Sequence, residues 1–235
     1  MTNQPSALSR IKSGLNGKTL AAYAAIIVVV HLLWNTMFIY PLKILTVFFH
    51  ELSHALAAIL TGGKVIEIGL VQEQGGHCVT AGGNGFLIAS AGYLGSMLCG
   101  GILLLAAAKS NRDKQIMAAL GVVLVAVSLI WIRPFLDFGF IFCMILGGAM
   151  IASGKFVSGK ANDWILRAVG LTSCLYATLD VKSDTIDRDL EQSDAGRLAE
   201  ITGMPSFFWG YLWMTLAVIG TIGFIVMAAE TKKKA

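Results

Sequence analysis

Long apolar stretches constrain the fold of this chain more than any other feature of its sequence. A helix needs about 17 to 25 predominantly apolar residues to cross the hydrocarbon core of a bilayer. Seven stretches approach that length: 20–40, 44–61, 86–108, 116–132, 135–151, 163–181 and 207–229. The sequence therefore predicts an all-α polytopic membrane protein with about six or seven transmembrane helices. The fourth and fifth stretches are short, and the alternative for them is one hairpin in place of two full spans.

The composition leaves little room for a soluble domain. Of the 235 residues, 56% are hydrophobic and only 14% are charged, whereas a soluble domain carries about 25% charged residues. We therefore treat residues 1–235 as a single integral membrane domain, with its functional core in 44–181 and an acidic, polar loop in 182–206. The net charge of +4 comes largely from basic residues near the two ends. Such flanks contact lipid headgroups, so we expect the bilayer, and no nucleic acid, as a partner.

A glycine-rich segment separates the second and third apolar stretches. It covers residues 62–85 and contains three Gly-Gly pairs together with the β-prone run from Val65 to Val71. Glycine pairs favour turns, and branched apolar residues favour strands. The segment therefore predicts a small hairpin, or one or two short strands, at the membrane surface.

Three ionisable residues lie inside the second apolar stretch, in the segment His50-Glu51-Leu52-Ser53-His54. On a helix, this HExxH spacing places the two imidazoles on one face, where both can reach one metal ion. The glutamate then lies near enough to take a proton from a bound water. Ionisable residues within a span are costly unless paired, and they are usually functional. We therefore predict zinc as the cofactor, His50 and His54 as its ligands and Glu51 as the general base, in preference to hydrogen bonding between helices without a metal.

A catalytic zinc ion needs a third protein ligand and an open position for water. Two aspartates lie at the ends of apolar stretches on the side of the membrane where the HExxH helix ends, namely Asp137 and Asp180. If each stretch crosses once, both carboxylates are within reach of His54. Alternatively, each faces water or pairs with a basic neighbour, Arg133 or Lys182. The residues themselves leave both aspartates open as the third ligand.

Small residues form a ridge on the third apolar stretch. Gly92, Ser96 and Gly100 follow one another at four-residue spacing. In lipid, small residues on one helix face allow two backbones to approach closely. The general expectation is tight helix packing. The more specific one is that this helix packs against the HExxH helix and holds its histidines in place.

These motifs follow an order that resembles the site-2 protease family of intramembrane zinc metallopeptidases. More narrowly, they resemble its compact bacterial and fungal branch, which lacks a PDZ insertion. The resemblance covers roughly residues 44 to 215, although Ser53 replaces the glycine that is usual before the second histidine. The matching segments are Phe49 to Ala55, Leu60 to Gly63, Gly82-Gly83, Ser90 to Ser96, Ser173 to Tyr176 leading to Asp180, Ser193-Asp194-Ala195, Trp209-Gly210 and Trp213.

The resemblance implies a function for the predicted residues. It implies zinc bound by His50 and His54, Glu51 as the general base, and a transmembrane protein or peptide as the substrate, cut within or near the bilayer. It favours Asp180 over Asp137 as the third ligand, because Asp180 ends a run that matches the compact branch. It also implies a multi-pass protein of a bacterial cell membrane.

Two other functions stay open. A catalytically silent relative would bind membrane proteins and regulate their stability or trafficking, and a transporter or channel would use the ionisable residues as a relay. The intact motif favours the protease, because a silent relative has no need of Glu51. A substrate helix must unwind before cleavage, since its carbonyls are hydrogen-bonded within the helix. We expect segment 62–85 to offer a strand edge to the unwound peptide.

Overall fold

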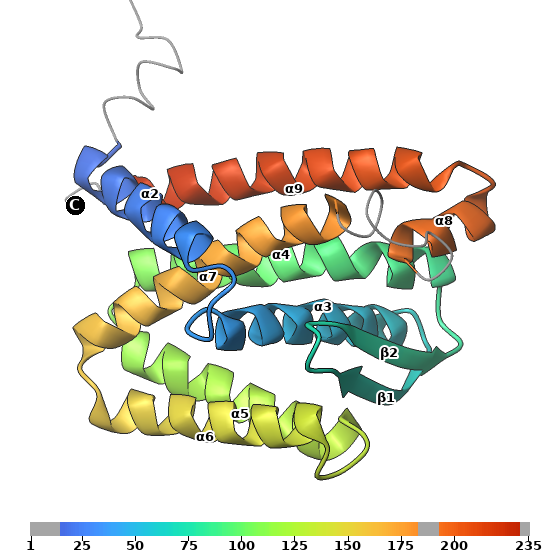
Figure 1. Ribbon diagram of the computed structural model, residues 1–235, viewed down its shortest axis with the longest axis horizontal. Helices are drawn as coiled ribbons and strands as arrows, with labels where there is room; N and C mark the ends of the chain where they lie inside the picture. The colour runs from blue at the N-terminus through green and yellow to red at the C-terminus, as the bar shows by residue number, and fades with distance from the viewer. Residues whose placement is uncertain (1–14, 183–192, 231–235) are drawn as a thin grey trace, which may run out of the picture.

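Five helices of this protein are long and apolar enough to cross a membrane, among the residues that the computed structural model describes, 15–182 and 193–230. They are α3, α4, α5, α6 and α9. A two-stranded sheet lies at one end of the helical bundle (Figure 1). This confirms the predicted all-α membrane fold with a small strand segment. The elements in chain order are α2 (Gly17–Leu32), α3 (Tyr40–Leu60), β1 (Lys64–Leu70), β2 (Gly76–Ala81), α4 (Gly85–Lys109), α5 (Asp113–Trp131), α6 (Phe138–Phe156), α7 (Gly159–Lys182), α8 (Asp194–Thr202) and α9 (Ser206–Ala229).

The first predicted span, 20–40, is not one continuous helix. Helix α2 starts after Asn16, whose side chain accepts hydrogen bonds from the backbone of the first helical turn, and it ends after 16 residues. Turns occupy residues 33–39, and α3 begins with Pro41 in its first turn. Proline is favoured there because it has no N–H to leave unpaired. The apolar run predicted one element, but its residues divide between a short helix, a turn and the start of α3.

The helices α5 and α6 correspond to the two short apolar stretches. Each has 19 residues and meets the length and composition needed to cross a membrane. They lie side by side (Figure 1), and their backbones approach closely at two glycines. A Cβ atom on Gly121 would lie 2.5 Å from the carbonyl oxygen of Gly147. The structure therefore favours two spans over the alternative of one short hairpin.

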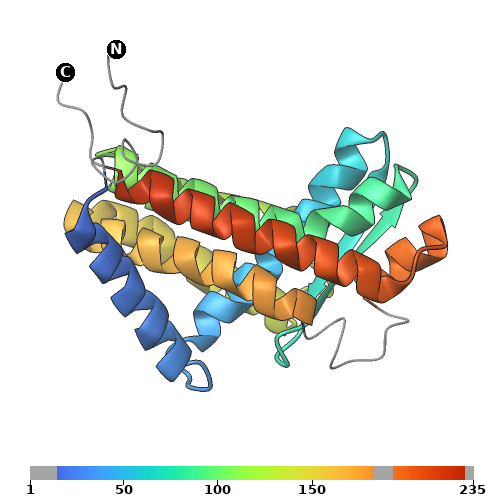
Figure 2. The ribbon, with the colours of Figure 1, turned by 90° about the horizontal axis from the view of Figure 1, so that it is seen from above.

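Helix α3, which carries the HExxH segment, is the most buried of the five apolar helices. In an apolar stretch of 18 residues, about 78% of α3 is buried, against 22% for the corresponding stretch of α6. Figure 2 shows α3 crossing the direction of α4 and α9, which run side by side. The HExxH segment therefore lies in the protein interior, whereas most residues of α6 are exposed or only partly buried.

The glycine ridge of the third stretch packs as expected, but against two different helices. Gly92 of α4 faces α3, where an added Cβ would lie 2.6 Å from the Nε2 atom of His54. Two turns later, Gly100 faces α7, where an added Cβ would lie 2.6 Å from the carbonyl oxygen of Gly170. The expectation that this helix packs against the HExxH helix is confirmed, and α4 also joins that helix to α7.

The hairpin predicted in 62–85 is present as β1 and β2, which pair antiparallel. The outer edge of β1 is covered, because the N–H of Arg133 donates to the carbonyl of Ile68 at 3.0 Å and Ile132 forms a bridge with the same residue. Within the described ranges, no strand pairs with the other edge of β2. The sheet therefore has one covered edge and one edge without a strand partner.

The predicted polar loop, 182–206, contains a helix that the sequence analysis did not expect. Helix α8 starts after Ser193, whose hydroxyl accepts the N–H of Gly196 at 3.1 Å, an N-cap arrangement. It ends at Gly203, which adopts the left-handed conformation with φ of 72°. Residues 183–192 lie outside the described part of the chain. The description of the segment as a loop is therefore wrong for its second half.

Candidate metal centre

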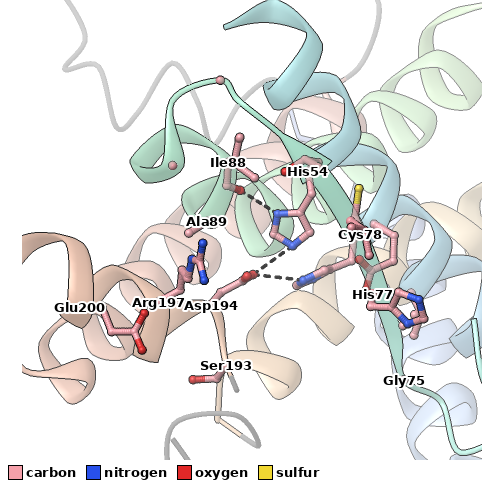
Figure 3. A pocket seen from close by; sticks show the side chains of 18 of the residues that line it. His54, Gly75, His77, Cys78, Ile88, Ala89, Ser193, Asp194, Arg197 and Glu200 are labelled. Carbon is pink, nitrogen blue, oxygen red and sulfur yellow. Dashed lines mark hydrogen bonds and ion pairs between the residues drawn. The ribbon is translucent and has the colours of Figure 1, made fainter. Parts of the chain in front are cut away.

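Two helices that are far apart in the sequence meet at one point of the structure. Helix α3 presents His50 and His54 one turn apart, and α8 presents Asp194 from its first residue. The Oδ2 atom of Asp194 lies 3.1 Å from Nε2 of His50 and 3.2 Å from Nε2 of His54. Figure 3 shows the Asp194 carboxylate pointing at His54. All three potential ligand atoms lie within 4.8 Å of one another, a donor set that suits a catalytic zinc ion.

A backbone carbonyl orients one of the two histidines. The Nδ1 atom of His54 lies 2.7 Å from the carbonyl oxygen of Ile88, near the start of α4 (Figure 3). A carbonyl oxygen can only accept, so Nδ1 carries the N–H of this hydrogen bond, and in the neutral ring the lone pair of Nε2 is then available to a metal ion. Metal-binding histidines generally use their second nitrogen in this way. His54 is therefore held in the tautomer that a metal ligand requires.

The space beside the histidines exists because residue 92 is a glycine. A Cβ atom at Gly92 would collide with Nε2 of His50 and lie 2.6 Å from Nε2 of His54. Real Cβ atoms do not approach other heavy atoms so closely, so any larger residue would displace the two rings. The donor set and the space that Gly92 leaves both fit a bound zinc ion.

Asp194 carries a negative charge in this setting. Burial raises the pKa of the Asp194 carboxyl, but the adjacent rings of His54 and His50 lower it by more, so its pKa lies well below its usual range. The residue is therefore a carboxylate at neutral pH, as metal binding requires.

Glu51 lies between the histidines in sequence and beneath the sheet in space. Only 5% of its surface is exposed. A Cβ atom on Gly76, the first residue of β2, would lie 2.6 Å from its Oε1 atom. Among the described residues, no lysine or arginine forms an ion pair with Glu51. The backbone of β2 therefore covers the carboxylate without neutralising it.

These residues line a cavity of about 1220 Å³ between the hairpin and α8. In Figure 3, His77 and Cys78 of β2 lie on one side of His54, and Arg197 and Glu200 of α8 lie on the other. Burial, with a smaller contribution from the charge of Glu51, raises the pKa of the Cys78 thiol to about 12. The thiol is thus protonated at neutral pH. A cavity of this size accommodates several residues of a peptide.

Comparison with family models identifies the relationship of this chain to known proteins. A model of the family described as Peptidase M50B-like matches residues 23–224. The chain belongs to the Peptidase M50B-like family. The match contains the HExxH segment and α8, and it confirms the resemblance to site-2 proteases. Searches of curated proteins and of solved structures found no match.

Membership of the Peptidase M50B-like family gives the residues predicted from sequence a common context. The structure brings His50, Glu51 and His54 to one cavity. Asp137 lies apart from them, at the start of α6, where its Oδ1 atom accepts the N–H of Phe138 at 2.8 Å. Asp180 lies in α7, but its side chain is outside the described part of the structure, so its role stays a prediction.

Asp194 is the candidate ligand that the sequence analysis missed. It was assigned to a polar loop, although Ser193-Asp194-Ala195 was among the segments that resemble the site-2 proteases. A serine followed by an acidic residue is also a typical helix start. Those signals indicated α8, but they could not indicate that α8 lies over α3.

Proposed function

We propose that this protein is a zinc-dependent intramembrane metallopeptidase that cleaves other membrane proteins within or near the bilayer. One observation carries the proposal: His50, His54 and Asp194 converge beside the buried Glu51 in a cavity of a membrane protein. Family membership supports a metallopeptidase, because the Peptidase M50B-like family matches most of the chain. The three converging residues would hold the zinc ion.

Each residue has a distinct role in this proposal. Zinc in such a site supplies a Lewis acid for the scissile carbonyl and makes a bound water more acidic. Glu51 accepts the proton of the attacking water and transfers it to the amide nitrogen of the leaving group. The Ile88 carbonyl keeps the His54 ring oriented through its Nδ1 atom. Because Gly92 has no side chain, it leaves space beside the Nε2 atoms of both histidines.

The hairpin offers a way to bind an unwound substrate. The edge of β1 is covered by Ile132 and Arg133, whereas residues 76–80 of β2 line the cavity. A peptide that adds to β2 as a further strand would replace its lost helical hydrogen bonds by sheet hydrogen bonds. The peptide would then pass next to Glu51, which lies against Gly76. We propose this strand addition as the binding mode.

The decisive experiment compares the wild type with Glu51→Gln. Both proteins are purified in lipid nanodiscs, their zinc content is measured, and a panel of transmembrane peptides is incubated with each and read by mass spectrometry. We expect about one zinc per chain in both and cleavage by the wild type alone. The matched control is Glu230→Gln, which changes a carboxylate at the end of α9 and should cleave normally.

Two outcomes would contradict the proposal. Cleavage by Glu51→Gln at the wild-type rate would exclude Glu51 as the base. Zinc in both proteins without cleavage of any peptide would favour a catalytically silent relative that binds membrane proteins.

A further inference from the structure

The wall of the cavity opposite β2 is formed by α8, and one arginine of that helix lines it. Arg197 lies one turn after Asp194 and is exposed. Its helix is anchored on the other face by Ala195 and Leu198, which are fully buried among aromatic residues of α4 and α9. Figure 3 shows Arg197 on the same side of the cavity as Asp194. The anchoring therefore holds Arg197 toward the site.

Arg197 differs from the arginines that have a structural role. Arg133 donates to the carbonyls of Ile130 and Ile132, and Arg167 is paired with Asp163. Within the described part of the chain, the guanidinium of Arg197 has no hydrogen bond or ion pair. It is also the one lysine or arginine among the described residues that line the cavity. Its donors are therefore available to a molecule that enters.

A peptide strand on β2 would need such donors. Only one edge of the added strand pairs with β2, and the other edge faces away from the sheet, toward α8. Its carbonyl groups lose water when the peptide enters the cavity, and a carbonyl that gains no donor in exchange is costly. An arginine carries five N–H donors and no acceptor, so it satisfies carbonyl oxygens without regard to the side chains beside them.

We propose that Arg197 binds backbone carbonyl oxygens on the outer edge of the substrate strand, so that the peptide is held between β2 and α8. The inference rests on the proposed peptidase function and extends it to a substrate-binding residue. Because the contact is with the backbone, it acts equally on substrates with acidic, neutral and basic side chains. Since α8 also carries Asp194, one helix positions both the peptide and a metal ligand.

The test measures zinc content and kcat/KM for Arg197→Ala and Arg197→Lys. The substrates are one transmembrane peptide in three forms, with Asp, Gln or Lys beside the cleavage position. We expect unchanged zinc and a roughly 10- to 100-fold lower kcat/KM for Arg197→Ala, since charged hydrogen bonds are lost. The loss should be the same for all three peptides, and Arg197→Lys should recover part of it. Arg112→Ala, an exposed arginine at the start of α5, is the matched control.

A binding experiment supports the kinetics without relying on turnover. Zinc-loaded Glu51→Gln protein, with or without Arg197→Ala, is titrated with peptides in which single backbone carbonyls are replaced by thiocarbonyls, which are weaker acceptors. If the proposal holds, at least one replacement weakens binding to the protein that has Arg197 and has no effect on the protein that lacks it. If every carbonyl replacement weakens binding by the same factor in both proteins, Arg197 does not contact those carbonyls and the proposal is overturned.

The outcomes separate this inference from the proposed function. A loss confined to the peptide with Asp would assign Arg197 to a substrate carboxylate and overturn the backbone contact. Wild-type kinetics in Arg197→Ala would overturn any role in binding, while Glu51-dependent cleavage would still support the peptidase. Failure of the wild type to cleave any peptide would instead count against the proposed function itself.

Discussion

The Nε2 atom of His54 lies 3.2 Å from Oδ2 of Asp194, so the candidate metal centre joins a buried membrane helix to a short helix at the end of the bundle. Helix α3 is held by packing along its length, whereas α8 has only nine residues and packs against α4 and α9. A metal ion bound by both would therefore also stabilise the position of α8, because binding energy is available only when both helices are in place.

The first prediction concerns the third ligand. Asp194→Asn removes the charged oxygen donor, so we expect the zinc content after dialysis to fall well below that of the wild type. Asp137→Asn, which changes a carboxylate at the start of α6, should keep its zinc. Inductively coupled plasma mass spectrometry on both variants measures the difference.

The same measurement tests the residue that the family resemblance favoured. If Asp180→Asn loses zinc while Asp194→Asn retains it, Asp180 is the ligand and the contact of Asp194 with the histidines has another purpose. If only Asp194→Asn loses zinc, the geometry of the described residues has identified the ligand correctly.

The second prediction concerns the space beside the histidines. Gly92→Ala places a methyl group against the Nε2 atoms of His50 and His54, so both rings must move. We expect zinc affinity to fall at least about 10-fold, the size of effect that misplaced metal ligands typically cause. Competition with a chelator measures the affinity. Gly148→Ala is the matched control, because a Cβ there meets no atom within 4 Å; an equal loss in that variant would exclude the steric explanation.

The third prediction concerns the general base. In Gly76→Ala, the new methyl group would lie 2.6 Å from Oε1 of Glu51, so the carboxylate must shift while the zinc ligands stay in place. We expect kcat to fall roughly 100-fold, as misplacement of a catalytic group by about 1 Å can cause, with zinc content unchanged. Steady-state cleavage of a saturating transmembrane peptide measures it. Unaltered kcat would mean that β2 does not position Glu51.

The fourth prediction concerns Cys78, whose thiol pKa is raised to about 12 by burial and by the charge of Glu51. Thiolates are the reactive form, so alkylation at pH 8 should be at least about 100-fold slower than for a free cysteine and should still increase up to pH 10. Removing the negative charge in Glu51→Gln lowers the pKa, so that variant should react faster. Mass spectrometry of iodoacetamide-treated protein measures the rates. A plateau near pH 9 would contradict the shift.

The local features of this protein followed from local patterns. Apolar length predicted most of the helices, because a bilayer imposes one minimum length on all of them. The HExxH spacing placed His50 and His54 on one face, because the helical repeat depends only on neighbouring residues. The glycine pairs and the run from Val65 to Val71 predicted the hairpin for the same reason. Hydropathy did not show the turn at 33–39, since most of its residues are apolar and its two polar residues, Asn35 and Thr36, are too few to interrupt the run.

By itself, the sequence determined that the chain is a helical membrane protein and that one helix carries two histidines and a glutamate suited to a metal. Only the tertiary structure decided that Asp194 reaches them and that Arg197 lines the same cavity. The position of α8 depends on Ala195 and Leu198, which pack against aromatic residues of the next helix, α9, and of α4, a helix distant in the chain. Contacts of that kind are selected by the fit of the whole fold, which the spacing of residues along the sequence does not encode.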